Sequence, residues 1–78
     1  MEMREELLKR IVINPKVMVG KPVIKGTRIP VDTIVRLIAQ GMTIEEILDD
    51  YPKLDKDDIK AALLYSAEVV SGEVVLPA

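Results

Sequence analysis

The sequence predicts a mainly α-helical fold in which a short N-terminal helix and a β-hairpin precede a three-helix bundle. Two observations carry this prediction: apolar residues recur at helical spacing in the second half, and short β-branched runs separated by glycine and proline fill most of the first. A chain of 78 residues supports one core, so we expect a single domain over residues 1–78. We divide it into the helix and hairpin (1–30), the bundle (31–71) and a tail (72–78).

The first predicted element is a short helix over residues 2–10, EMREELLKR. Its residues favour helix, and glutamates come before Lys9 and Arg10, as the helix dipole prefers.

Short strands are predicted next, in the runs IVIN, KVMVG, PVIK and TRIPV. Lys25 and Gly26 separate residues 22–24 from residues 27–29, and a glycine at positive φ turns the chain tightly enough for these two arms to pair. Proline cannot donate to a sheet ladder, so Pro22 and Pro30 mark the limits or the edge of this hairpin.

Two capped helices follow it. One is predicted over residues 31–40, with Gly41 as its left-handed C-terminal cap. The next begins with Thr43 as N-cap and Glu46 completing a capping box, and Pro52 ends it. Met42 is placed to pack onto Ile47 as a hydrophobic staple at the start of the second helix. The apolar positions are Val31, Ile34, Val35, Leu37 and Ile38 in the first of these helices, and Ile44, Ile47, Leu48 and Tyr51 in the second.

The last helix begins with Asp55 as N-cap and Asp58 at the third position, and Gly72 ends it. Its apolar residues point in two directions, which places it centrally in the monomer or against a second chain. The main stripe is Ile59, Ala62, Leu63, Ala67 and Val70, with Leu54 stapling to Ile59. We expect Leu64 and Tyr65 to point elsewhere, and they are the candidate partner-binding residues together with Val74, Val75 and Leu76, which could add as a strand to a partner's sheet edge.

Composition excludes several classes of function. The chain has no cysteine and no histidine, so disulfides, thiolate or imidazole metal sites and the usual nucleophile–base pairs are absent. We therefore expect no enzyme activity, no catalytic residue, no metal, no cofactor and no small-molecule substrate. No apolar run is long enough for a membrane span and the start is unlike a signal peptide, which predicts a cytoplasmic protein. With 49% hydrophobic residues in so small a chain, we expect a homodimer.

Charge is distributed unevenly. Residues 1–36 hold eight basic and four acidic residues, whereas residues 37–78 hold three basic and nine acidic ones. This asymmetry suggests two faces with different partners, or copies that meet basic to acidic. The alternative is solvated surface charge with no partner, since surfaces normally carry mixed charge.

Two candidate sites fail on their spacing. The stretch GKPVIKGT lacks the lysine before its threonine that a phosphate loop needs, and Pro22 removes an N–H from the loop. The acidic pairs adjoin one another on helices, where neighbours diverge by about 100° and do not share a metal ion. They are Glu45 and Glu46, Asp49 and Asp50, and Asp57 and Asp58. Most of them lie at helix starts together with Asp55, where capping explains them.

Three short helices with a tight turn before the last also fit a helix-turn-helix DNA-binding pattern. The start of the last helix is acidic, however, which disfavours contact with phosphates. If DNA is bound, we expect the hairpin to act as a wing, and the alternative for each of its basic residues is ordinary solvated charge. The candidate nucleic-acid-binding residues are Lys21, Lys25, Arg28 and Arg36.

Residues 10–70 resemble the family known as domain of unknown function 433 (DUF433), small bacterial and archaeal proteins treated as antitoxin-like, and the most specific segment is GKPVIKGTRIP at residues 20–30. The resemblance implies a homeodomain-like helical fold after a hairpin, and often a role beside a toxin with a PIN-like nuclease fold. It brings no established catalytic or ligand residue. Gly20, Gly26 and Pro30 fit turn chemistry, and Thr27 and Arg28 could clamp the hairpin onto the helices.

The leading hypothesis is therefore a non-enzymatic antitoxin of a type II toxin–antitoxin system, which binds a PIN-like toxin and could also bind its own promoter DNA. The alternatives are a stand-alone DNA-binding regulator and a homodimeric scaffold.

Overall fold

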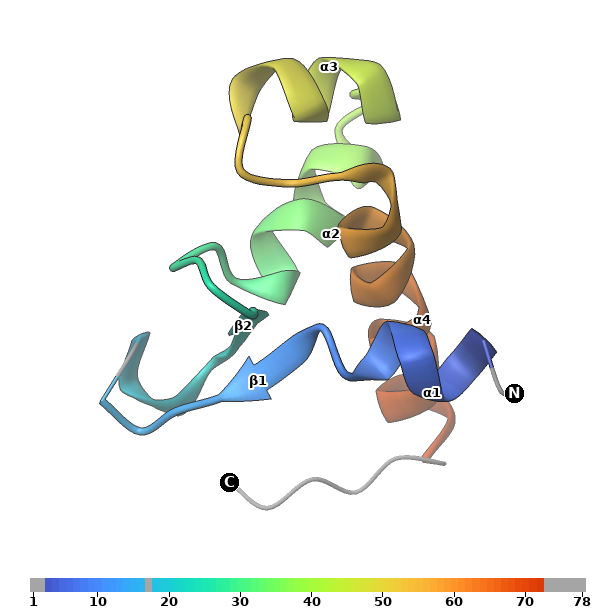
Figure 1. Ribbon diagram of the computed structural model, residues 1–78. Coiled ribbons are helices and arrows are strands. Elements are labelled where there is room, and N and C mark those ends of the chain that lie inside the picture. Colours follow the sequence, from blue (N-terminus) through green and yellow to red (C-terminus); the bar gives the residue numbers. More distant parts are fainter. Residues whose placement is uncertain (1–2, 17, 73–78) are drawn as a thin grey trace.

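The chain folds as a mainly helical domain, as the sequence predicts (Figure 1). The computed structural model describes residues 3–16 and 18–72. In chain order its elements are helix α1 (Met3–Leu8), strand β1 (Ile11–Ile13), a 3-10 turn η1 (Met18–Gly20), strand β2 (Pro22–Ile24), and helices α2 (Val31–Ala39), α3 (Ile44–Asp50) and α4 (Lys56–Ser71).

The hairpin forms, but its first arm lies earlier in the chain than expected. Strand β2 pairs antiparallel with β1, which places Ile11 opposite Ile24 and Ile13 opposite Pro22. The predicted arm at residues 27–29 is not a strand. It contributes a hydrogen bond of 3.0 Å from the Ile24 N–H to the Ile29 carbonyl, and a single bridge joins Val23 to Pro30.

Backbone chemistry explains both differences. Pro30 has no N–H to continue a ladder, whereas β1 offers a donor at every position. The expected strand KVMVG is interrupted because Val19 and Gly20 both have positive φ, at 55° and 80°, which extended chain does not allow. The turn at Gly26, with φ at 81°, is as predicted.

The helix starts confirm the predicted caps. In α3 the Thr43 hydroxyl accepts from the Glu46 N–H at 3.1 Å, and the Glu46 carboxylate accepts from the Thr43 N–H at 2.8 Å. Asp55 and Asp58 form the same reciprocal pair at the start of α4, at 2.9 and 3.0 Å. Gly72 closes α4 in the left-handed conformation. These local bonds account for the agreement between expected and observed helix bounds.

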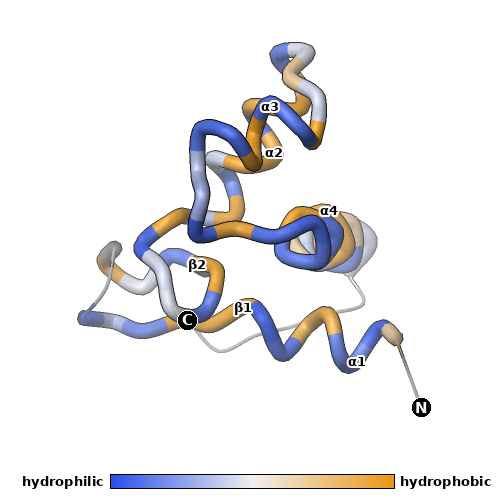
Figure 2. The backbone as a smooth tube through the Cα atoms, turned by 45° about the horizontal axis from the view of Figure 1, so that its top comes forward, coloured by the Kyte–Doolittle hydropathy of each residue, from blue (hydrophilic) through white to orange (hydrophobic). Residues whose placement is uncertain are grey.

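Helix α4 is the central element. It contacts α1, α2, α3 and β1, and seen nearly end-on it lies between α1 on one side and α2 and α3 on the other (Figure 2). The apolar side chains of the helices turn inward around it. The core consists of Ile24, Val31, Ile34, Ile47, Leu54, Ile59, Ala62 and Tyr65.

The orientation of α4 differs from the predicted one. Ile59 and Ala62 are buried as expected, but Tyr65 joins them in the core and Val70, at 88% exposed, faces solvent. Asp58 and Glu68 are buried as well, because each forms an ion pair with an arginine from the N-terminal segment. A prediction from apolar periodicity assumes that acidic residues face solvent. It therefore placed a different side of α4 against the core.

Among the described residues, no helix combines the length and apolarity needed to cross a membrane.

Candidate functional site

The predicted basic residues separate into two groups. Lys25 and Arg28 lie on the turn after β2, where both are exposed. Lys21 and Arg36 line a shared hollow between the end of the hairpin, α2 and α4. The four candidates therefore lie in two separate places: Lys21 and Arg36 line the hollow, whereas Lys25 and Arg28 do not.

Thr27 positions the first pair. Its hydroxyl donates to the Ile24 carbonyl at 2.8 Å and accepts from the Ile29 N–H at 3.0 Å, while its own N–H donates to the Ile24 carbonyl at 3.0 Å. These three bonds, with the positive φ of Gly26, fix the turn that carries Lys25 and Arg28 outward. The turn is thus clamped by Thr27, whereas Arg28 projects to solvent and makes no side-chain bond within the described chain.

The start of α4 is an acidic cluster tied to Arg10. The Arg10 guanidinium lies 2.9 Å from Asp58, 3.1 Å from Asp55 and 3.7 Å from Asp57. Hydrogen bonding to Asp58 above all raises the pKa of Arg10. The backbone N–H of Asp58 lowers the pKa of Asp55, with Arg10 adding to the effect against the opposing influence of burial. These acids are therefore engaged within the fold by Arg10.

The predicted partner-binding residues have mixed positions. Tyr65 is only 9% exposed and belongs to the core, where burial raises the pKa of its hydroxyl. Leu64 is half-buried. Val74, Val75 and Leu76 lie outside the described residues. Tyr65 thus contributes to the fold of the monomer, and a partner has little access to it.

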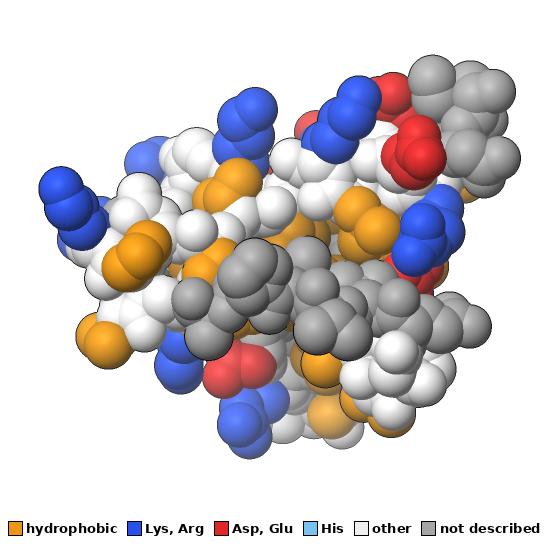
Figure 3. Space-filling view, turned by 90° about the horizontal axis from the view of Figure 1, so that it is seen from below, with side chains coloured by type: hydrophobic (Ala, Val, Ile, Leu, Met, Phe, Trp, Pro, Cys, Tyr) orange, Lys and Arg blue, Asp and Glu red, His pale blue; other side chains and the backbone are white. Residues whose placement is uncertain are grey.

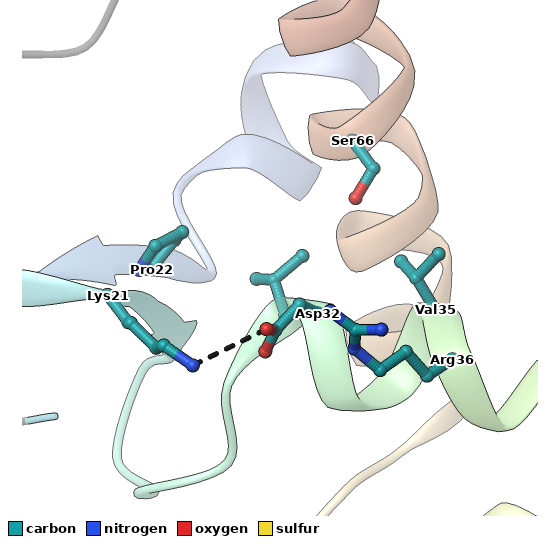
Figure 4. A pocket seen from close by; sticks show the side chains of 7 residues that line it. Lys21, Pro22, Asp32, Val35, Arg36 and Ser66 are labelled. Carbon is teal, nitrogen blue, oxygen red and sulfur yellow. Dashed lines mark hydrogen bonds and ion pairs between the residues drawn. The ribbon is translucent and has the colours of Figure 1, made fainter.

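Sequence reasoning missed the hollow at Lys21 and Arg36. It has a volume of about 370 Å³. Figure 4 shows Lys21 reaching toward Asp32 on the first turn of α2, and Ser66 of α4 turned toward the same space. Its residues come from three elements, so no local pattern in the sequence indicates it. The lining consists of Lys21, Pro22, Val31, Asp32, Val35, Arg36 and Ser66.

One face of the molecule carries basic and acidic side chains along its margins, with hydrophobic side chains between them (Figure 3). Within the described ranges, no group of three or more acidic side chains is arranged to hold a metal ion. The features available for recognition are therefore basic groups, apolar surface and the exposed acids of α3.

Comparisons with known proteins agree with this architecture. Residues 11–66 match a family described as "Protein of unknown function (DUF433)". A crystal structure of a DUF433 member from Anabaena variabilis superposes with a TM-score of 0.76 at 36% identity, covering 88% of this chain and 68% of that one. This structural similarity supports a fold in which helices follow a β-hairpin.

Two relatives are described as uncharacterised proteins. The protein y4eO of Sinorhizobium fredii is 36% identical over 53 residues, which are 68% of this chain but only 24% of that protein. A protein of Archaeoglobus fulgidus is 70% identical over 30 residues, or 38% of this chain and 83% of that one. The chain thus spans about a quarter of the length of the first relative.

Proposed function

Because the chain belongs to the DUF433 family, we propose that it is a non-enzymatic, antitoxin-like protein that binds a toxin with a PIN-like nuclease fold. A toxin that cleaves RNA presents basic groups where its substrate lies, so an acidic surface on the inhibitor complements it. The exposed acids of α3 supply such a surface, and they are the observation that carries this proposal. They are Glu45, Glu46, Asp49 and Asp50.

These acids are suited to a partner because little within the fold neutralises them. Glu46 caps its own helix through the Thr43 N–H. Glu45, Asp49 and Asp50 form no ion pair within the described chain, in contrast to the aspartates at the start of α4, which Arg10 engages. Acids without an internal counterion retain their charge for an encounter with a basic surface.

Co-expression with the product of the adjacent reading frame tests this function. A tag on that product should retain the wild-type chain, and Asp49→Lys together with Asp50→Lys should abolish retention. Glu5→Lys together with Glu6→Lys reverses the same amount of charge on exposed positions of α1 and serves as the matched control. A wild-type chain that remains a lone monomer and captures no partner contradicts the proposal.

A second candidate function is promoter binding through the turn after β2. Lys25 and Arg28 are exposed and have no ion pair within the described residues, so both are available for phosphates. Duplex binding that falls steeply with salt and is lost on replacing Lys25 and Arg28 supports this candidate. Lys53→Ala in the loop before α4 is the control, and equal loss with that variant contradicts a role for the turn.

A further inference from the structure

The hollow beside Lys21 is open and has an apolar floor. It lies where the end of the hairpin, the first two turns of α2 and the middle of α4 meet. Val31 and Val35 of α2 and Pro22 of β2 form the floor, and Figure 4 shows Val35 directed toward α4 across the space. Its volume of about 370 Å³ is at the lower end of ligand-binding pockets, which run from roughly 300 to 1,000 Å³.

An exposed apolar stripe on α4 extends this floor. Ser66 lines the hollow, and residues three and four positions away share its face of the helix. Leu63 and Val70 are 38% and 88% exposed, and Ala67 between them is exposed as well. From Leu63 to Val70 the stripe is about 10 Å long, or two helical turns. Side chains that periodicity places in the core thus form surface beside the hollow.

The charges at the rim are unequal. Lys21 lies 3.5 Å from Asp32, and both side chains are about half exposed, so this pair is weak. Arg36 is exposed and has no ion pair within the described part of the chain. The rim therefore carries two cations against one carboxylate. A guanidinium without a counterion is suited to receive a carboxylate in a two-point hydrogen bond.

We propose that this groove between α2 and α4 docks an acidic amphipathic helix of a partner protein. The apolar face of that helix covers Val35, Ala67 and Val70, and one of its carboxylates binds Arg36. This inference rests on the proposed function, because it names a surface by which the chain holds a partner. Helices laid into grooves place apolar anchors three and four residues apart, which suits a stripe of two turns.

Two synthetic helical peptides test the charge and shape together. Each has about 14 residues, or roughly four turns, with leucines three and four positions apart. One carries glutamates at the flanking positions, and its twin carries lysines in their place. Titration into the full chain, followed by amide chemical shifts, should show the glutamate peptide binding about tenfold more tightly than its twin. The shifts should centre on Val35, Ser66 and Val70.

Surface variants supply the matched controls. Arg36→Glu should weaken binding of the glutamate peptide about tenfold, whereas Lys53→Glu, the same charge change in the loop before α4, should leave it unaltered. Val70→Glu should weaken it as well. Met3→Glu introduces the same charge at a 72% exposed position of α1 that does not line the hollow, and it should leave binding unaltered. Equal binding of both peptides, binding by neither, or indifference to Arg36→Glu overturns the proposal.

Self-association is the remaining outcome. Sedimentation equilibrium that shows a dimer broken by Val70→Glu but not by Met3→Glu assigns the groove to a second copy, and this also overturns the proposal. The co-expression experiment reports separately on the proposed function. A partner retained equally by wild type and Arg36→Glu leaves that function intact while rejecting the groove.

Discussion

Arg4 of α1 forms a bidentate ion pair with Glu68 of α4. The Arg4 Nε donates to one carboxylate oxygen and its Nη2 donates to the other at 2.6 Å. The Glu68 side chain is 7% exposed, whereas that of Arg4 is 48% exposed. The pair joins residues 64 positions apart in sequence and docks the first helix onto the last.

Because Glu68 is buried and Arg4 is half exposed, removing Arg4 alone should destabilise the protein more than removing both partners. Arg4→Ala leaves a buried carboxylate unpaired and should lower the free energy of unfolding by about 1–2 kcal/mol, a value reduced for the half-exposed arginine. Adding Glu68→Leu should recover most of that loss. Urea denaturation followed by circular dichroism measures both. Lys9→Ala, which removes only an exposed pair with Glu6, is the control and should change stability by less than about 0.5 kcal/mol.

Acid should destabilise the fold partly through Asp55. Its pKa in the folded chain lies below the usual value of 3.8, so its contribution is fully present above that value and is lost as pH falls through the lower folded pKa. Asp55→Asn keeps a capping oxygen and removes the titrating charge. The variant should therefore lose less stability than wild type between pH 5 and strongly acidic conditions, as melting temperatures will show. Parallel curves for the two proteins would refute this role.

The phase of α4 can be tested by truncating one buried and one exposed residue. Tyr65→Ala removes a core side chain and should cost about 3 kcal/mol. Val70→Ala should change stability by less than about 0.5 kcal/mol, because that side chain is 88% exposed. Thermal unfolding compares the two, and Tyr65→Phe keeps the fold if truncation is too severe. A larger effect at Val70 than at Tyr65 would restore the orientation that periodicity predicts.

The backbone at Val19 stores strain. Its φ of 55° is in the left-handed region, which β-branched residues avoid, and its side chain is 95% exposed and contributes little packing. Val19→Asn, a residue that tolerates this conformation, should raise the free energy of unfolding by about 0.5–1 kcal/mol. Chemical denaturation measures the change, with Val12→Asn in β1 as the opposite case, which should destabilise. A destabilising Val19→Asn would show that the side chain makes contacts of its own.

The sequence by itself determined the features that depend on neighbours along the chain. Both capping boxes, at Thr43 and Asp55, are satisfied within four residues, and the turns at Gly26 and Gly41 require only a residue that accepts positive φ. The helix bounds and the order of the helices could therefore be predicted before any contact was known.

Only the tertiary structure decided which strand pairs with β2 and which side of α4 faces inward. Both depend on residues distant in sequence: Ile11 supplies the ladder to Ile24, and Arg4 and Arg10 neutralise the acids that α4 buries. An ion pair between residues 48 or 64 positions apart produces no periodic pattern in the sequence from which it could be predicted. The hollow at Arg36 follows from the same choice, because turning Tyr65 inward turned Ser66 and Val70 outward.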